Sequence, residues 1–230
     1  MDSAKDGRFC RGAACEDVNR LKEETGQLRM ELRRFAGLLD RERRLRRVAE
    51  EKALVDPLTG AFNKRGLGQK FDGELSKVRR FGRGLCLIFF DVDNFKAFNS
   101  LHGQRAGDLV LSGVIECVRA NLRPYDTVHR IGGEEFVVLL PETDSLGNAI
   151  IVAERLREKI EGTEIPYGGK TLCVSVSMGV AKFQERGGLQ DLIHHANLAE
   201  MGAKGAGKNR VFAFSESGVV PAEEYVKGGA

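Results

Sequence analysis

The sequence predicts an α/β fold with a mixed sheet flanked by helices, preceded by an N-terminal coiled-coil helix. From about residue 56 onward, apolar runs of strand length alternate with stretches of helical periodicity, which is typical of an α/β domain. Two such runs, Thr127 to Ile131 and Phe136 to Leu140, flank a Gly-Gly pair, which indicates an antiparallel hairpin within the sheet. The stretch before residue 56 has no strand pattern and repeats its apolar residues at helical spacing.

Length and composition fit one sizeable domain with an extension. The chain has 230 residues, of which 42% are hydrophobic and 30% charged, as in soluble globular proteins. Its net charge of +3 is too small to indicate a nucleic-acid partner by itself. No apolar run approaches the roughly 20 residues needed to span a bilayer, and the first residues form no signal segment. We therefore expect a cytoplasmic protein without a membrane or nucleic-acid partner.

Residues 16–55 are expected to form a coiled-coil stalk that follows a disordered N-terminus at residues 1–15. The apolar stripe is narrow, so the helix cannot bury it alone and is expected to pair with a second copy. Basic residues at 41–47 alternate with acids, which favours a solvated helix face over a nucleic-acid contact. The stripe consists of Val18, Leu21, Thr25, Leu28, Leu32, Phe35 and Leu39, with Leu38, Leu45 and Val48 continuing it after a shift of register.

The α/β domain is expected over residues 56–214 and a flexible tail over 215–230. A continuous apolar strand covers residues 85–90, and an alternating strand covers 171–180. Apolar faces predict helices at 64–81 and 189–203, a helix that begins near Asp108, and a helix that carries Ala149 and Ile160 inward. A last strand is expected at 211–214.

The five cysteines show no framework spacing. Cys86, Cys117 and Cys173 lie in apolar patterns and are expected to be small buried hydrophobic residues. Cys10 and Cys15 lie in the polar N-terminal segment. A redox or metal role for that pair stays open, although four-residue spacing without a nearby histidine gives it little support.

Two pairs of carboxylates stand next to apolar strands. Asp91 and Asp93 follow the buried strand, and Glu134 and Glu135 follow the Gly-Gly turn, whose glycines are expected to adopt positive φ angles. Like charges near a core repel each other and are costly to desolvate unless a cation neutralises them. Aspartate oxygens and a backbone carbonyl such as that of Val92 are ligands that Mg²⁺ uses. Strand alternation predicts that the two glutamates point to opposite faces and have different roles.

A basic, glycine-rich loop near the C-terminus completes the set. It carries Lys204 and Lys208, which suit the phosphates of a nucleoside triphosphate. If the hairpin lies beside the buried strand, the carboxylates, a metal ion and these lysines converge at one end of the sheet. Phosphoryl or nucleotidyl transfer is the reaction class that such a site favours.

These motifs resemble the GGDEF family of diguanylate cyclases over about residues 54–214. Several of them occur in the family's order and at its spacing, which a single Gly-Gly-Glu-Glu-Phe would not provide. They are Asp56-Pro57-Leu58-Thr59-Gly60, Asp91-Val92-Asp93-Asn94-Phe95-Lys96, Asn99, Gly107-Asp108, Arg130-Ile131-Gly132-Gly133-Glu134-Glu135-Phe136, Ser175-Val176-Ser177-Met178-Gly179-Val180 and Gly207-Lys208-Asn209-Arg210.

The resemblance implies a fold like the palm of nucleotidyl cyclases and polymerases. It also implies that a homodimer condenses two GTP into cyclic di-GMP and releases pyrophosphate. Asp91, Glu134 and the Val92 carbonyl would bind Mg²⁺, with Mn²⁺ as an alternative. Glu135 would either support the metal or deprotonate the attacking 3′-hydroxyl. The remaining roles would be phosphate binding by the backbone N–H groups of Phe95 and Lys96 and by Lys204 and Lys208, and guanine recognition by Asn99 and Asp108.

A regulatory site is also implied. Arg123 and Asp126 match the family's inhibitory Arg-x-x-Asp motif, which would bind product, with Arg155 as a further contact; an ordinary Arg/Asp turn is the alternative. The chain departs from the family's usual residues without touching an expected metal or guanine contact, so we expect activity to survive. A catalytically weak module that acts as a cyclic di-GMP receptor is the second hypothesis, and a basic coiled-coil nucleic-acid binder is the third. The departures are Ser100, Gln104, Asn197, Glu200 and Met201, the last two replacing a Leu-Tyr pair.

Overall fold

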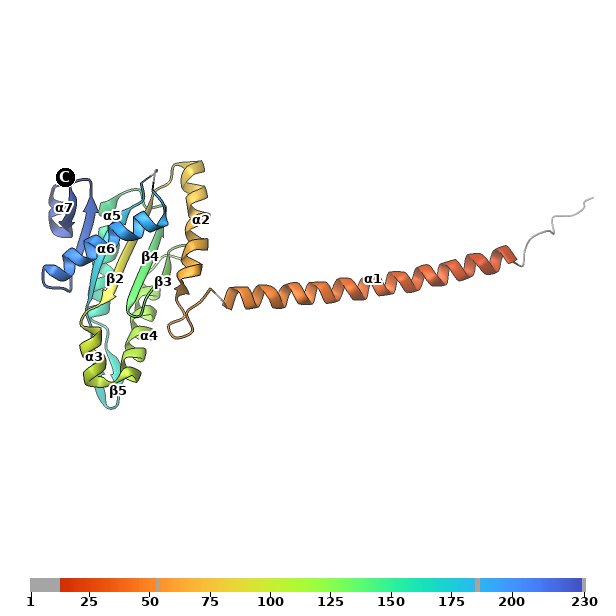
Figure 1. Cartoon of the computed structure of the whole chain (residues 1–230), viewed down its shortest axis with the longest axis horizontal. Helices are drawn as coiled ribbons and strands as arrows, with labels where there is room; N and C mark the ends of the chain where they lie inside the picture. The colour runs from red at the N-terminus through yellow and green to blue at the C-terminus, as the bar shows by residue number, and fades with distance from the viewer. Residues whose placement is uncertain (1–12, 53, 185–186, 229–230) are drawn as a thin grey trace, which may run out of the picture. The chain divides into compact units, whose positions relative to one another are not determined.

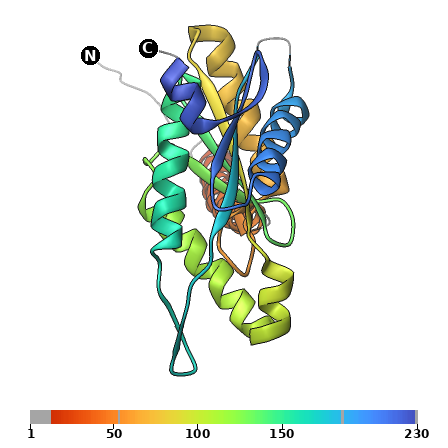
Figure 2. The same ribbon diagram turned by 90° about the vertical axis from the view of Figure 1, so that its left-hand side faces the viewer.

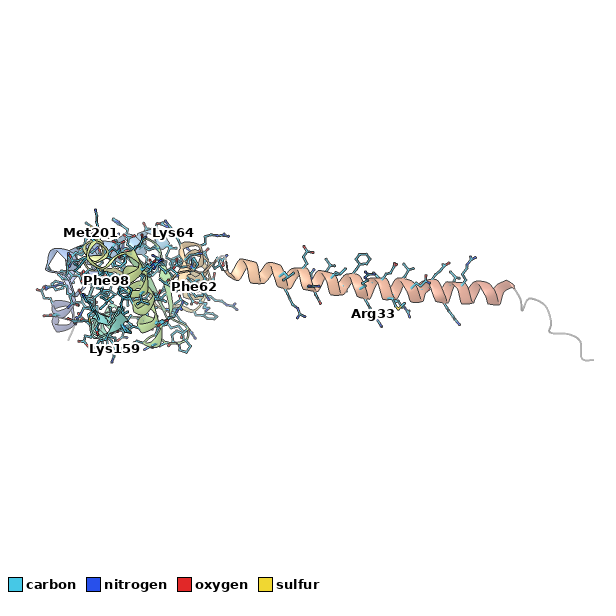
Figure 3. The ribbon with its side chains drawn as sticks, turned by 90° about the horizontal axis from the view of Figure 1, so that it is seen from below. Arg33, Phe62, Lys64, Phe98, Lys159 and Met201 are labelled. Atoms are coloured by element: carbon cyan, nitrogen blue, oxygen red, sulfur yellow. The ribbon has the colours of Figure 1, made fainter. Side chains whose placement is uncertain are left out.

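The computed structural model describes residues 13–52, 54–184 and 187–228, and the chain divides into two units, residues 1–53 and 54–230. The first unit is the single helix α1, Ala13–Lys52. Its described side chains are exposed and point away from the helix on several sides, as Figure 3 shows around Arg33. Leucines of the predicted stripe are more than half exposed, for example Leu28 at 59% and Leu32 at 67%. This apolar surface has the form that a second helix would cover.

The helix begins at Ala13, inside the stretch that we expected to be disordered. Residues 1–12, with Cys10, lie outside the described part of the chain. The predicted boundary between stalk and domain at residue 55 lies close to the division after residue 53.

The second unit contains a seven-stranded mixed sheet with helices on both faces, as predicted (Figure 1). Strand β2, Leu85–Val92, lies at its centre and is antiparallel to both neighbours, β4 (Glu135–Pro141) and β7 (Val176–Lys182). The order is β1-β3-β4-β2-β7-β8-β9, with β7 and β8 parallel. The outer strands are β1 (Phe62–Asn63), β3 (Thr127–Arg130), β8 (Val211–Ser215) and β9 (Gly218–Pro221).

Alternate residues of β2 face two separate cores. Ile88 and Phe90 pack with α4 (Gln104–Ala120) and α5 (Leu146–Glu161). Leu87 and Phe89 pack with α2 (Lys64–Phe81) and α6 (Leu189–Gly205). Figure 2 shows the teal α5 and the light-blue α6 on opposite sides of the sheet. Because side chains alternate along a strand, Asp91 belongs to the face that α6 covers.

Helix α6 lies unusually close to β7 because glycine and alanine meet there. A Cβ atom built on Gly179 would lie 2.0 Å from the carbonyl oxygen of Ala196 and 2.3 Å from the backbone nitrogen of Glu200. The side chains of Ala196, Ala199 and Ala203 are fully buried along the same stripe. This stripe of small residues is therefore the surface by which α6 contacts the sheet.

The expected single strand at 171–180 is wrong. Lys170–Leu172 forms β6, which pairs with β5 (Ile165–Tyr167) in a separate hairpin that extends from the lower end of Figure 2, and β7 starts only at Val176. The prediction failed because apolar and polar residues alternate in the sequence through residues 173–175, although these residues pair with no neighbouring strand in the described part of the chain. Cys173 is consequently exposed, whereas Cys86 is buried and Cys117 half-buried.

The expected flexible tail at 215–230 is also wrong for its described part. Gly218–Pro221 forms β9, which pairs with β8, and α7 follows at Ala222–Gly228. Val219 and Val220 lie opposite Phe214 and Ala213, and Ala222 is buried in the core. Residues 229–230 lie outside the described part.

Hydrogen bonds of Arg130 join the hairpin turn to the start of the domain. Arg130 donates from Nη1 to Oδ1 of Asp56 at 3.0 Å, and from Nε and Nη2 to the carbonyl of Gly133 at 3.0 and 2.7 Å. Asp56 also accepts from the backbone nitrogen and hydroxyl of Thr59. Burial alone would raise the pKa of Asp56, but the hydrogen bonds from Thr59 and Arg130 outweigh it and hold the pKa below its ordinary value.

Asp56→Asn should lower the free energy of unfolding at neutral pH by about 1–2 kcal/mol, because it removes the charge that Arg130 pairs with in a largely buried contact. A carboxylate whose pKa is depressed by folding stabilises above its unfolded pKa, and the effect is lost as the pH falls through its folded pKa. The difference between wild type and variant should therefore begin to shrink as the pH falls below about 3.8, the ordinary pKa, and should vanish only below the lower pKa of the folded state. Urea unfolding followed by circular dichroism across pH measures this. The exposed Asp72→Asn is the control, and an equal loss in both variants would contradict the assignment.

Candidate active site

The two carboxylate segments meet at one end of the central strands, as the sequence predicted. Asp91 lies opposite Glu135 in the β2–β4 register and opposite Ser177 in the β2–β7 register. The backbone nitrogen of Val92 donates to the carbonyl of Glu134 at 3.4 Å. Cross-strand partners point to the same face, so Glu135 shares the α6 face with Asp91.

The turn between β3 and β4 differs from the two-residue turn that we expected. Arg130 is the last residue of β3 and Glu135 the first of β4, and the nitrogens of Ile131 and Gly132 both donate to the carbonyl of Glu135. Neither glycine has a positive φ angle. A Cβ at Gly132 would lie 2.1 Å from Oε2 of Glu135, so a larger residue there would require the end of that side chain to shift.

Asp91 is a largely buried carboxylate whose charged form is disfavoured. Its side chain is 12% exposed, and Nζ of Lys204 lies 3.2 Å from its Oδ1. Burial, opposed by Lys204 and reinforced by the carboxylates of Glu200 and Glu134, raises the pKa of Asp91 to about 6. Both the predicted ligand Glu134 and the cross-strand partner Glu135 are therefore in the neighbourhood of Asp91.

Asp93 has a different role from Asp91. Its carboxylate accepts from the hydroxyls of Ser175 and Ser177 at 2.7 and 2.6 Å, and from the backbone nitrogen of Asn209 at 3.1 Å. These donors tie the end of β2 to β7 and to the loop before β8. Because its oxygens are already satisfied, Asp93 acts as an anchor of the surrounding loops.

The basic, glycine-rich loop lies against the start of α3 (Phe95–His102), but Lys204, which we expected in this loop, is part of α6. Lys208 donates to the side-chain oxygen of Asn94, the residue before α3. Asn94 has a left-handed backbone and its side chain does not cap the helix. The backbone N–H groups of Phe95 and Lys96 thus lie at the N-terminus of α3, next to Lys208. A helix N-terminus favours the binding of anions.

The predicted guanine-binding residues lie where α3 packs on α4. Oδ1 of Asn99 is buried and has no hydrogen-bond partner among the described residues. It lies so close to Gly107 that a Cβ there would come within 1.9 Å of it. The half-buried Asp108 follows on α4. A buried acceptor without a donor is costly, and a ligand with N–H groups would satisfy it.

Glu200 is the site residue that the sequence did not indicate. We expected it to be a departure away from the metal, but it is 2% exposed and its Oε1 lies 2.9 Å from Nζ of Lys204. Burial raises the pKa of Glu200, against the effect of Lys204 and together with Asp93 and Glu135. The signal that could have revealed it is the spacing of four residues between Glu200 and Lys204 on one helix.

The predicted product-binding residues also come together. Oδ2 of Asp126 accepts from the backbone nitrogen of Arg123 at 3.0 Å, and Arg155 donates to the carbonyl of Asn121 at 2.9 Å. Burial raises the pKa of Asp126, and the nearby charges of Arg123 and Arg155 oppose the rise. The charges of Arg123, in the turn before β3, and of Arg155, on α5, thus both act on the carboxylate of Asp126.

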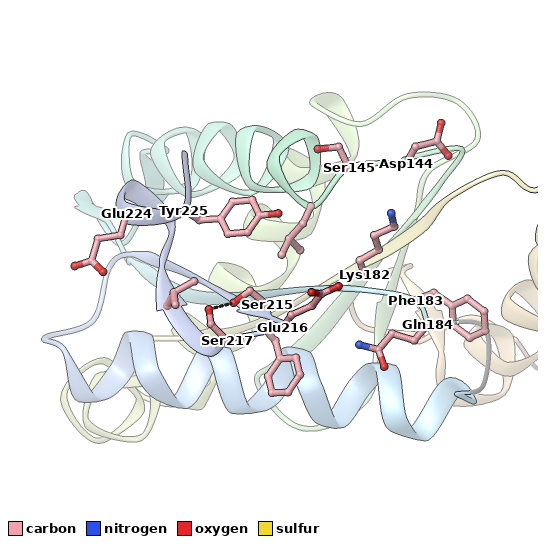
Figure 4. A pocket seen from close by; sticks show the side chains of 13 residues that line it. Asp144, Ser145, Lys182, Phe183, Gln184, Ser215, Glu216, Ser217, Glu224 and Tyr225 are labelled. Carbon is pink, nitrogen blue, oxygen red and sulfur yellow. Dashed lines mark hydrogen bonds between the residues drawn. The ribbon is translucent and has the colours of Figure 1, made fainter. Parts of the chain in front are cut away.

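A separate hollow of about 990 Å³ lies at the other end of the strands (Figure 4). Lys182, which lines it, pairs with Cys86 at the start of β2, whereas Asp91 is near the end of β2. Ser145, Glu216 and Tyr225 also line it. This hollow is distinct from the carboxylate site.

The carboxylate site fits a divalent cation by the chemistry of its donors. Asp91 and Glu134 supply hard oxygens, and Lys204 already partly neutralises Asp91. Within residues 13–52, 54–184 and 187–228, no three His, Cys, Asp or Glu side chains form a ready metal cage. Two carboxylates with substrate phosphates are a usual set for Mg²⁺, which keeps several waters.

None of the described helices carries an apolar stretch that could cross a membrane.

Comparisons with known proteins agree with this architecture. A family model described as diguanylate cyclase, GGDEF domain, matches residues 53–210. Diguanylate cyclase DgcP of Pseudomonas aeruginosa is 38% identical over 161 residues, which are 70% of this chain and 24% of DgcP. The structure of diguanylate cyclase SiaD from P. aeruginosa, in complex with its activator SiaC, has a TM-score of 0.68 at 31% identity and covers 87% of this chain and 78% of that chain.

The coiled coil and GGDEF domain of DgcB from Caulobacter crescentus, in complex with c-di-GMP, has a TM-score of 0.70 at 23% identity and covers 85% of this chain and 98% of that chain. At that identity it shows the shared fold. The present chain spans about a quarter of the length of DgcP. The family match covers more than half of the chain and includes the carboxylate segments, the helix starts and Lys204 described above, and the chain belongs to the GGDEF family.

Proposed function

We propose that this chain is a diguanylate cyclase that condenses two GTP into cyclic di-GMP with release of pyrophosphate. The observation that carries the proposal is the meeting of Asp91, the Gly-Gly-Glu-Glu turn and Lys204 beside the uncapped start of α3. The name of DgcP and its 38% identity support it. Carboxylates alone would suit several metal sites, but the nearby lysines and helix N-terminus favour a nucleoside triphosphate.

Asp91, Glu134 and the Val92 carbonyl would hold Mg²⁺ or Mn²⁺, which would polarise the phosphates and stabilise charge on the leaving pyrophosphate. The N–H groups of Phe95 and Lys96, with Lys204 and Lys208, bind the terminal phosphates and orient the α-phosphate. Asn99 and Asp108 select guanine, whose N1–H and amino group are donors that adenine does not offer in this arrangement.

Glu135 supports the metal site in this proposal. It lies opposite Asp91 across the strands, and its carboxylate packs against Gly132. The alternative role, acceptance of the proton from the attacking 3′-hydroxyl, requires the hydroxyl of a GTP held by a second subunit. Each subunit holds one GTP, so the reaction needs two sites face to face.

The stalk would bring the two subunits together. The open apolar stripe of α1 supports a homodimer through a coiled coil, as does the coiled coil present in the DgcB structure. The cluster of Arg123, Asp126 and Arg155 supports product inhibition, because guanidinium groups bind phosphates and guanine edges. That same cluster favours the second candidate, a receptor that binds cyclic di-GMP without making it.

Purified protein incubated with GTP and Mg²⁺ should produce cyclic di-GMP, measured by liquid chromatography. Asp91→Asn and Glu134→Gln should each lower kcat by at least about 100-fold, because they remove groups that stabilise charge in the transition state. Glu224→Gln, an exposed acid on α7, is the matched control. A wild-type chain that makes no product at any protein concentration, yet binds cyclic di-GMP, would replace the cyclase proposal with the receptor.

Removal of residues 1–50 should lower specific activity in dilute solution and leave it nearly unchanged at high protein concentration, because the stalk raises the local concentration of the second half-site. Leu32→Glu in the full chain should act in the same direction by placing a charge in the apolar stripe. Arg33→Glu, off the stripe, is the control. Activity that does not depend on dilution in the truncated form would rule out dimerisation through the stalk.

Arg123→Ala should raise the concentration of cyclic di-GMP needed for half-inhibition by at least about tenfold, since a charge-assisted hydrogen bond contributes about 1.5–3 kcal/mol. The initial rate without product should stay the same. Rates measured with increasing added product test this, with the exposed Arg105→Ala as control. Unchanged inhibition would reduce Arg123 and Asp126 to an ordinary turn.

A further inference from the structure

Glu200 is a buried acidic residue next to Lys204, and the site described so far assigns no function to it. It is 2% exposed, and its backbone nitrogen lies where α6 approaches Gly179 most closely. Its Oε1 lies 2.9 Å from Nζ of Lys204, but no donor among the described residues reaches that oxygen in hydrogen-bond geometry. An ionised carboxylate in such a place is costly unless a cation stays beside it.

Lys204 is shared between two carboxylates on different elements. Its ammonium lies 2.9 Å from Glu200 on α6 and 3.2 Å from Asp91 on β2. The two acidic side chains are 3% and 12% exposed and the lysine is 36% exposed, so water and salt screen these contacts less than they would between fully exposed side chains. The glutamate precedes the lysine by four residues, which is the favourable order on a helix. Because one ammonium serves both acids, a change at either acid alters its attraction to the other.

A cation bound at Asp91 would compete with this ammonium. Two positive charges at one carboxylate repel each other, most strongly where water is excluded. Glu200 provides a second acceptor on the same helix as Lys204. The ammonium can therefore move off Asp91 while it stays near Lys208 and the start of α3, where phosphates are expected.

We propose that Glu200 is a positioning residue that draws Lys204 away from Asp91, so that Asp91 accepts a divalent cation while the ammonium remains available to the substrate phosphates. The inference rests on the proposed cyclase function, since it takes Asp91 as a metal ligand. Without Glu200, Lys204 keeps its contact with Asp91 and opposes cation binding more strongly. Glu200 thus sets how readily the metal enters the site.

Titration of the full-length chain with Mn²⁺ in the absence of GTP tests the proposal, with free Mn²⁺ measured by electron paramagnetic resonance. Glu200→Gln should weaken Mn²⁺ binding by about three- to tenfold, the range expected for coupling between contacting groups. Lys204→Met should tighten binding. In the Lys204→Met background, Glu200→Gln should have less than half of its original effect on the logarithm of Kd. An equal effect in both backgrounds would reduce Glu200 to a nearby charge and overturn the proposal.

Glu200→Leu separates charge from packing. It fills the same space with an apolar group and should weaken Mn²⁺ binding as Glu200→Gln does, with a thermal melt to show that the chain is folded. A Leu variant that binds Mn²⁺ like the wild type would overturn the proposal. Glu116→Gln, an exposed acid on α4, controls for the loss of one charge and should leave binding unchanged.

Asp91→Asn distinguishes failure of this inference from failure of the proposed function. If it leaves Mn²⁺ binding unchanged, or if the wild type takes up no Mn²⁺ in the absence of GTP, the role of Glu200 is overturned, and the proposed function falls only if the chain also makes no cyclic di-GMP from GTP. If Asp91→Asn abolishes binding while Glu200→Gln and Lys204→Met act independently, only the role of Glu200 is wrong. Loss of binding together with dependence of the Glu200 effect on Lys204 supports both.

Discussion

A carboxylate at the end of a fully buried strand is the constraint on which the site depends. All eight residues of β2 are buried, and β4 and β7 hold the strand from both sides, so Asp91 cannot move out into solvent. The desolvation of its charge must be offset by groups that neighbouring elements bring to it. Lys204 on α6 is one such group. The same requirement makes the site receptive to a cation that can take over this neutralisation.

The loops around Asp91 are held by polar contacts between segments far apart in the sequence. Asp93 joins the end of β2 to Ser175, Ser177 and the nitrogen of Asn209, while Arg130 joins Gly133 to Asp56. A buried, fully satisfied acid or base fixes a loop more firmly than apolar contacts, since few other geometries satisfy it. The groups that we propose to bind substrate are therefore preorganised by residues outside that proposed set.

Hydrophobic patterns in the sequence predicted those helices and strands that depend mainly on neighbouring residues. Helix 64–81 and strand 85–90 follow from periodicity and continuous apolar character, and the meeting of Asp91 with the hairpin follows from how a mixed sheet pairs. Glu200 escaped prediction because its burial depends on which side of α6 faces β7. The sequence did indicate Asp93, but not its anchoring role, because the donors to its carboxylate come from 82 to 116 residues away. The strand β9 was missed because Val219 and Val220 become strand residues only through their pairing with β8.

The absence of a side chain at Gly179 determines how closely α6, which carries Lys204, approaches the sheet. The carbonyl of Ala196 and the nitrogen of Glu200 occupy the space that a methyl group would need, so the size of this residue sets the height of α6 above the sheet. Any larger residue would lift the helix and, with it, the ammonium of Lys204 away from Asp91. The position of Lys204, which we propose to bind phosphate, is thus set by a residue on a strand that does not carry it, and one added methyl group at Gly179 would change the geometry of the site without altering any of its functional groups.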